Sequence, residues 1–123
     1  MDQLDWEPGK NRLLGKTPAV LTMGAKQAGT VAKLLRGRLL KGKELTLTSQ
    51  NLQVVLESAQ DNGFKEGDNY VRIGLSEAAV QELSATLLPV EGEYKLSTSK
   101  GLMVRVRKTY IKDQEGNVVD TMG

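Results

Sequence analysis

An arginine pair near the C-terminus carries the most suggestive chemistry in this sequence. The apolar residues around it, Val104, Val106 and Tyr110, alternate as in a strand with one face on a core. Arg105 and Arg107 then point together into solvent, about 7 Å apart. Because guanidinium groups bind phosphate oxygens at two points, this spacing suits successive phosphates of a nucleic acid. An edge strand whose charges oppose aggregation explains the same pattern without a ligand.

Other basic residues extend this candidate phosphate-binding surface. They are Lys100, Lys108 and Lys112 beside the arginine pair, and Lys33, Arg36, Arg38, Lys41 and Lys43 upstream. Tyr94 is a candidate for stacking on a base. Since the chain has only one Trp, three Tyr and one Phe, we expect phosphate charge to dominate the contacts. The pattern favours a small nucleic-acid-binding protein.

Charged residues fall into blocks that the formal net charge of +2 conceals. Every charged side chain in residues 10–43 is basic, and residues 44–93 are mainly acidic. Residues 95–112 are again basic, and the tail is acidic. Such blocks either display a positive face to a polyanion or neutralise one another, within the fold or between subunits.

The absent residue types narrow the classes of function. Without cysteine or histidine there is no disulfide, thiolate nucleophile, imidazole ligand or Ser-His-Asp triad. The acidic segment containing Asp61, Glu66 and Asp68 lacks the ligand spacing of a calcium loop. We therefore expect a non-enzymatic protein with no metal and no cofactor.

Two alternative functions stay open. The first is an assembly, virion or inhibitor protein that acts through protein–protein contacts, as a homo-oligomer or with another protein, for example a viral or mobile-element accessory protein. In that case Trp6 is a candidate interface anchor. The second is a binder of small anionic ligands that uses the same arginines.

The basic residues need a scaffold, and the first half of the sequence predicts part of it. Residues 1–18, with two prolines, two glycines and no periodicity, predict an irregular N-terminal arm before a single domain over 19–123. Residues 19–23 predict a short strand, and the spacing of Ala28, Val31, Ala32 and Leu35 predicts a helix. We expect a hairpin turning near 41–43, and a Ser49-capped helix with an apolar stripe that stops at Asn62-Gly63.

The second half predicts a loop over 64–69, a strand over 70–73, and a helix capped by Ser76 and ended by Pro89. Strands follow over 94–99 and 102–111, and residues 113–117 predict a hairpin turn into Val118-Val119. The fold class is α+β, with a mostly antiparallel sheet, two or three helices and a C-terminal β-hairpin.

A weak internal similarity relates the two halves at an offset of 50 residues. Leu21-Thr22-Met23-Gly24 aligns with Val71-Arg72-Ile73-Gly74, and Leu52 and Val54 align with Leu102 and Val104. A duplicated unit explains this similarity. Because Leu52 and Val54 fall in a predicted helix and their counterparts in a predicted strand, chance similarity is the favoured explanation.

Membrane and targeting signals are weak in this sequence. Its apolar runs are far shorter than the roughly 20 residues that cross a bilayer. The first residues are acidic and lead into no apolar segment, which argues against a secretory signal. We expect a cytoplasmic protein.

Overall fold

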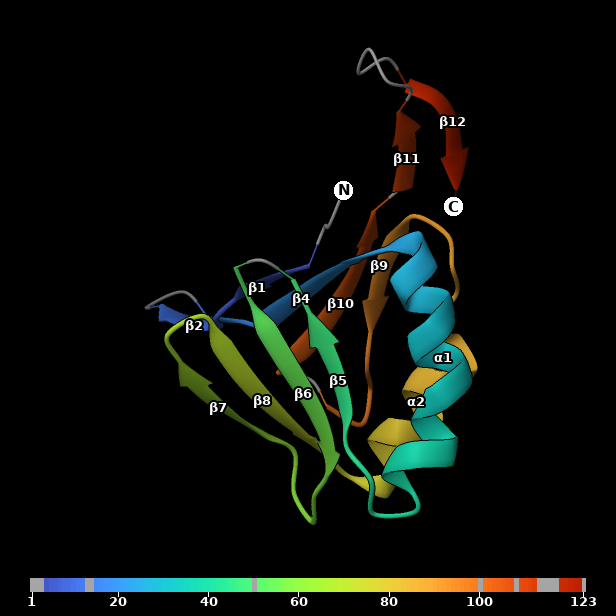
Figure 1. The fold of residues 1–123 in the computed structure, drawn as a ribbon. Coiled ribbons are helices and arrows are strands. Elements are labelled where there is room, and N and C mark those ends of the chain that lie inside the picture. The colour runs from blue at the N-terminus through green and yellow to red at the C-terminus, as the bar shows by residue number, and fades with distance from the viewer. Residues whose placement is uncertain are drawn as a thin grey trace.

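The computed structural model describes residues 4–12, 15–49, 51–99, 101–107, 109–112 and 118–122, with the backbone alone for 10–12, 15–16, 109–112 and 118–122. These residues form two helices and two four-stranded sheets, with two further hairpins (Figure 1). In chain order the elements are β1 (Asp5–Glu7), β2 (Lys10–Arg12), β3 (Gly15–Thr17), β4 (Ala19–Gly24), α1 (Ala25–Leu39), β5 (Leu45–Thr48), β6 (Gln53–Ser58), β7 (Gly63–Gly67), β8 (Tyr70–Leu75), α2 (Glu77–Thr86), β9 (Gly92–Lys95), β10 (Leu102–Arg107), β11 (Thr109–Lys112) and β12 (Val118–Met122).

The predicted α+β class is confirmed. The first sheet has the strand order β1-β4-β10-β9, and the second has β5-β6-β8-β7. In each sheet the central pair is parallel and the two outer pairs are antiparallel. The predicted C-terminal hairpin is present as β11 and β12, whose turn lies outside the described residues.

One core joins both sheets and both helices. Leu21 of β4 and Val104 of β10 contribute to it from the first sheet, and Leu56 of β6 and Ile73 of β8 from the second. Helices α1 and α2 lie next to each other along one side of the two sheets (Figure 1). Burial of this apolar surface is the main favourable contribution to folding.

The two halves of the chain repeat one order of elements. Each half has a strand, a second strand antiparallel to it, a helix and a further antiparallel pair: β1-β4-α1-β5-β6 and then β7-β8-α2-β9-β10. Among the described elements, the β2-β3 hairpin is an insertion in the first half. Each sheet combines the first two strands of one half with the last two strands of the other.

The strand register follows the 50-residue offset seen in the sequence. Thr22 lies opposite Arg105 in the first sheet, and Arg72 lies opposite Val55 in the second. Adding 50 to Thr22 gives Arg72, and subtracting 50 from Arg105 gives Val55, so both parallel pairs share one register. The internal similarity is therefore a structural repeat, and chance was the wrong explanation.

The helix predicted after Ser49 is wrong, because residues 53–58 form the central strand β6. Val54 and Leu56 face the shared core, while Val55 is 3% exposed on the opposite face, across from Arg72. Because β6 is buried on both faces, its sequence does not alternate between apolar and polar residues as a half-buried strand does. The spacing of Leu52, Val55, Leu56 and Ala59 therefore matched the apolar stripe of a helix. The Val54-Val55 pair is the β-branched signal for a strand.

Three other predictions are wrong. The described part of 1–18, residues 4–12 and 15–18, is not an irregular arm, because β1 pairs with β4 and β2 pairs with β3. No hairpin turns at 41–43, because α1 continues to Leu39 and β5 pairs with β6 instead. The predicted loop at 64–69 contains most of β7, an edge strand whose residues are all exposed and whose one large apolar side chain is Phe64. Local patterns missed β2, β3 and β7 because these strands carry little apolar signal, although their partners are close in sequence. Strand β1 was missed because it pairs with β4, which lies beyond the β2-β3 hairpin.

Several predicted elements are confirmed, with adjusted ends. Strands form at 19–24 and 70–75, and α1 and α2 are helices. Ser76 caps α2 by accepting a hydrogen bond from the N–H of Ala79 at 3.3 Å. Asn62, predicted as a helix stop, instead accepts from the N–H of Ser76 at 2.8 Å. The strand predicted at 94–99 is β9, which ends at Lys95, and the long strand at 102–111 is divided into β10 and β11.

Candidate functional site

Helix α1 presents most of the upstream basic residues to solvent. Its buried stripe of Ala28, Val31, Leu35 and Leu39 packs on the core. The 3.6-residue period places the cations on the remaining surface of the helix. We define the basic cluster as Lys33, Arg36, Arg38, Lys41 and Lys43, which are all exposed.

The end of α1 fixes the last three members of the basic cluster. The N–H of Lys43 donates to the carbonyl of Arg38 at 2.8 Å, and the N–H of Gly42 donates to that of Leu39 at 3.1 Å. Gly42 has φ +76°. This combination is the Schellman motif, in which a left-handed glycine satisfies the final helix carbonyls. The backbone carrying Arg38, Lys41 and Lys43 is therefore held in place before any ligand binds.

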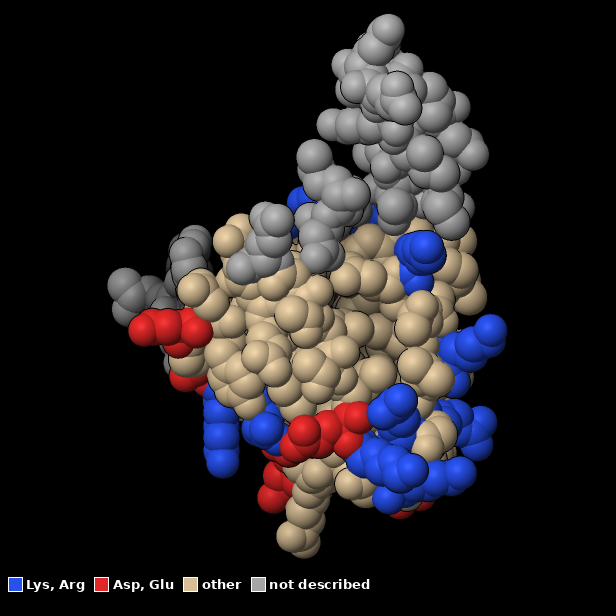
Figure 2. All heavy atoms as spheres, in the orientation of Figure 1, with Lys and Arg blue, Asp and Glu red and all other residues tan. Residues whose placement is uncertain are grey.

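The basic cluster forms no ion pair with any described residue. In Figure 2 blue side chains gather over the end of α1 and the turn that follows it, and red side chains lie beside them at the lower end of the sheet formed by β5, β6 and β8. Positive charges without acidic partners raise the local potential, and this potential attracts anions.

The predicted pair on β10 has a different environment. Arg105 donates through Nη2 to Glu93 Oε2 on the neighbouring strand β9 at 3.2 Å. Arg107 is exposed at the end of β10. Tyr94, the predicted stacking residue, is half-buried, and its hydroxyl donates to the carbonyl of Val90 at 2.7 Å. Arg105 and Tyr94 thus already have partners within the fold.

The structure does not bring the β10 pair and the basic cluster together. Arg107 lies opposite Gly24, the residue that immediately precedes α1. The basic cluster lies toward the other end of this 15-residue helix, which is about 22 Å long at 1.5 Å per residue. The single surface expected from the sequence is instead two separate groups of basic residues. Lys100 and Lys108 lie outside the described residues, and Lys112 is described only as backbone in β11.

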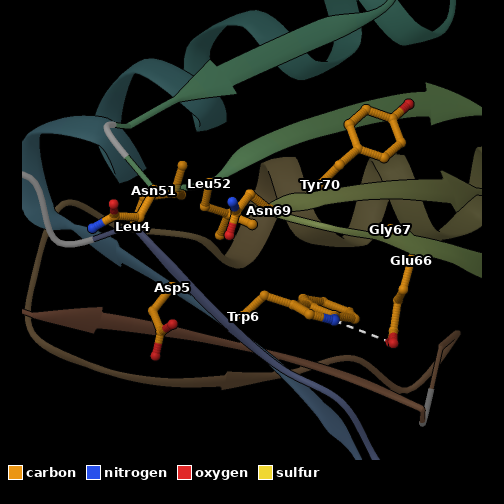
Figure 3. A pocket seen from close by; sticks show the side chains of 9 residues that line it. All are labelled: Leu4, Asp5, Trp6, Asn51, Leu52, Glu66, Gly67, Asn69 and Tyr70. Atoms are coloured by element: carbon orange, nitrogen blue, oxygen red, sulfur yellow. Dashed lines mark hydrogen bonds between the residues drawn. The ribbon is translucent and has the colours of Figure 1, made fainter.

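Trp6, the predicted interface anchor, bridges the two sheets within the chain. Its indole Nε1–H donates to Glu66 Oε1 on β7 at 3.1 Å. Its ring meets Phe64 edge to face, with centroids 5.2 Å apart. A groove of about 480 Å³ runs beside it, lined by residues 4–6, 51–52, 66–67 and 69–70 (Figure 3). Sequence reasoning singled out Trp6 and Glu66 separately but gave no sign that β1 and β7 meet.

Two carboxylate networks, which the sequence did not indicate, connect separate segments of the fold. Arg72 on β8 donates to Glu44 at 2.6 Å and to Glu57 at 2.5 Å. Hydrogen bonds to Glu44, Glu57 and Tyr70, in that order of size, raise the pKa of Arg72 above its ordinary value. Glu82 on α2 accepts four hydrogen bonds from the N–H and hydroxyl groups of Ser97 and Thr98, which lower its pKa to about 2.

Among the described residues, no group of three or more Asp, Glu, His or Cys side chains is placed to hold a metal ion. Neither of the two described helices has the length and apolar character needed to span a bilayer.

Comparison with known proteins gives a fold but no family. No family model matches the chain, and no curated protein matches it either. Among solved structures, the fold is similar to that of Drosophila Suppressor of Fused, with a TM-score of 0.57 and 15% sequence identity. The match covers 85% of this chain and 27% of that chain, so the present chain spans about a quarter of its neighbour's length. At this identity the similarity shows the α+β fold alone.

Proposed function

We propose that this is a non-enzymatic nucleic-acid-binding protein of the cytoplasm, and that the basic cluster at the end of α1 contacts phosphates. The observation that carries the proposal is that all five cations of the cluster are exposed and have no ion-pair partner among the described residues. Lys33 to Arg38 span about 8 Å along the helix axis. Closely spaced cations bind a polyanion by releasing its condensed counterions.

Binding of phosphate by this cluster costs little backbone conformational entropy. The Schellman turn already fixes the backbone of Arg38, Lys41 and Lys43, so binding needs to order only the side chains. The guanidinium forks of Arg36 and Arg38 are suited to two-point contacts with phosphate oxygens. No described aromatic ring belongs to the cluster, so we expect affinity that depends on charge more than on base sequence.

A matched pair of double variants tests the assignment. Arg36→Gln/Arg38→Gln and Arg105→Gln/Arg107→Gln remove the same charge from the two groups of arginines. Binding of labelled single-stranded DNA, RNA and duplex DNA is measured by fluorescence anisotropy at several salt concentrations. We expect the α1 variant to bind on the order of tenfold to a hundredfold more weakly at about 100 mM salt, with a salt slope lower by about 0.9 per lost contact.

The control variant separates this assignment from the one suggested by the sequence. Because Arg105 is paired with Glu93, we expect the β10 variant to keep most of the affinity. Loss of binding in the β10 variant alone would move the site to β10. Absence of binding by the unaltered protein at low salt would overturn the proposed function.

A protein partner is the second candidate function, and an exposed apolar segment after α2 favours it. Leu88 is 53% exposed and Val90 49% exposed, on either side of Pro89. Exposed apolar residues grouped in this way are typical of protein contacts. Size-exclusion chromatography with light scattering, at low and high salt and without nucleic acid, tests whether the partner is a second copy. A salt-resistant oligomer that Leu88→Ser/Val90→Ser disrupts is the expected result for this function.

A further inference from the structure

The groove beside Trp6 differs in chemistry from the basic cluster and lies on another part of the molecule. It runs between the start of β1 and the end of β7, the edge strands of the two sheets, whereas the basic cluster follows α1 (Figures 1 and 3). Its volume of about 480 Å³ falls within the range of roughly 300–1,000 Å³ that is usual for ligand sites.

The lining of this groove combines an aromatic ring with carboxylates. Trp6 provides the ring, and Asp5 and Glu66 provide the carboxylates. None of the described residues that line the groove is a lysine or an arginine, so this lining carries net negative charge. Asn51 and Asn69 add two side-chain amides, which both donate and accept hydrogen bonds.

Existing contacts hold the indole in position. The Nε1–H group is bonded to Glu66, and the ring is in edge contact with Phe64 and packs against the core. Figure 3 shows the ring extending along the groove from β1 toward Glu66, below Asn69. Because these contacts fix the ring, a ligand that stacks on its face would not have to order it.

We propose that this groove binds an arginine side chain presented by a peptide segment of a partner protein. A guanidinium group stacks on the indole face of Trp6 and donates to the carboxylate of Glu66, while Asp5 adds a second negative charge. A planar cation stacks on an aromatic face and bonds a carboxylate at two points, which an ammonium group does less well. An anion is disfavoured because both charged groups of the described lining are negative.

The size and the amides of the groove indicate a peptide rather than a free guanidinium compound. A guanidinium group alone fills only part of about 480 Å³. The Asn51 and Asn69 amides lie where they can bond the backbone of a bound peptide, since side-chain amides pair with peptide N–H and C=O groups. Tyr70 also lines the groove, but its ring points away from Trp6 (Figure 3), and its hydroxyl accepts from Arg72 Nε at 2.8 Å.

Trp6 gives the test a direct readout, because it is the only tryptophan of the chain. Its fluorescence is followed during titration of the unaltered protein with the blocked tripeptide Gly-Arg-Gly, and with the same peptide carrying citrulline or lysine in place of arginine. Citrulline keeps the shape of arginine and removes its charge. We expect a saturable change with the arginine peptide, and binding at least about tenfold weaker with citrulline and with lysine.

A charge-matched pair of variants assigns the site. In Asp5→Asn/Glu66→Gln both negative charges are lost, but the new amide oxygen on β7 can still accept from the indole, so the ring position is kept. We expect at least about tenfold weaker binding of the arginine peptide. The control Asp61→Asn/Glu77→Gln, which alters two exposed carboxylates outside the groove, should bind like the unaltered protein.

Three results would overturn the proposal: no saturable change with the arginine peptide, equal binding of the citrulline peptide, or full binding by the groove variant. Argininamide alone is the remaining comparison. Affinity equal to that of the tripeptide would overturn the assignment to a peptide, and weaker affinity supports it. Since the groove and the basic cluster share no residue, these results do not depend on nucleic-acid binding.

Discussion

Helices α1 and α2 occupy equivalent places in the two halves of the chain, yet their charges are opposite. Helix α1 contains Lys26, Lys33, Arg36 and Arg38 and no acid, whereas α2 contains Glu77 and Glu82 and no base. Both helices bury an apolar stripe against the shared core. The fold therefore requires the buried stripe but leaves the charge of the exposed surface free.

The partners of these charges differ as well. Glu82 of α2 is tied to the segment before β10 through Ser97 and Thr98, and Arg105 is paired with Glu93. Among the described residues, the basic cluster has no equivalent partner. Thus Glu82, Glu93 and Arg105 make contacts within the fold, whereas the five cations of the basic cluster are available to a ligand. Three predictions test this contrast.

The largest effect is expected where the two halves are most alike. Val54 of β6 and Val104 of β10 are related by the 50-residue offset, and both are completely buried in central strands. We expect Val54→Ala and Val104→Ala each to lower the free energy of unfolding by about 2–3 kcal/mol, because both leave a cavity in one core. Urea denaturation measures this loss. Two separate transitions, or losses that differ by more than about 1.5 kcal/mol, would show that the halves are not equivalent.

A smaller effect is expected at the end of α1, where the two helices differ in how they terminate. Gly42 adopts a left-handed φ of +76°, whereas Gly37 lies within the helix and a Cβ there would meet no atom within 4 Å. Gly42→Ala should therefore cost about 1–2 kcal/mol, and Gly37→Ala should stabilise by about 0.5–1 kcal/mol. Thermal unfolding gives both values. Changes of the same sign would contradict the Schellman geometry that positions the basic cluster.

The smallest effect concerns the pH dependence of Glu82. Its pKa is about 2 in the fold, against an ordinary value of 4.5, so the folded state binds this proton less readily than the unfolded state does. The stabilisation is fully present above pH 4.5 and disappears as the pH falls through about 2. We expect unaltered protein and Glu82→Gln to differ in stability by a constant amount near neutral pH and to converge in acid.

An NMR titration of the Glu82 carboxylate gives its pKa directly. The variant Ser97→Ala removes the hydrogen bond with the largest influence on this pKa, and should therefore move it back toward 4.5. A pKa near 4.5 in the unaltered protein would show that Ser97 and Thr98 do not bond the Glu82 carboxylate in solution. Glu82 would then be no more paired than the cations of the basic cluster.

Elements were predicted correctly where their signals lie within a few residues of one another, and were missed where the apolar pattern of a strand is absent. Helix α2 was predictable because its cap, apolar stripe and proline stop all act within a few residues, and Ser76 caps it as expected. Strand β6 was missed because burial on both faces gave Val54, Val55 and Leu56 no alternation. The exposed strand β7 was missed because its pairing with β8 uses the backbone and needs no apolar pattern.

Of the two candidate sites, one could be predicted from the sequence and the other could not. The basic cluster was visible in the sequence because its residues are close together along the chain. Whether Arg105 belonged to it could not be known before β9 placed Glu93 beside Arg105. The groove depends on the approach of β1 to β7, about 60 residues later in the chain, and no local pattern encodes that approach.

The sequence alone determined the α+β class, the lack of cysteine and histidine chemistry, and the separation of charge into blocks, because these depend on composition and local periodicity. The tertiary structure decided that the 50-residue similarity is a repeat with exchanged strands. It also decided that the basic residues form two separate groups and that Trp6 lines a groove with acidic side chains. These outcomes depend on strand pairing between distant segments, since the pairing fixes which side chains become neighbours.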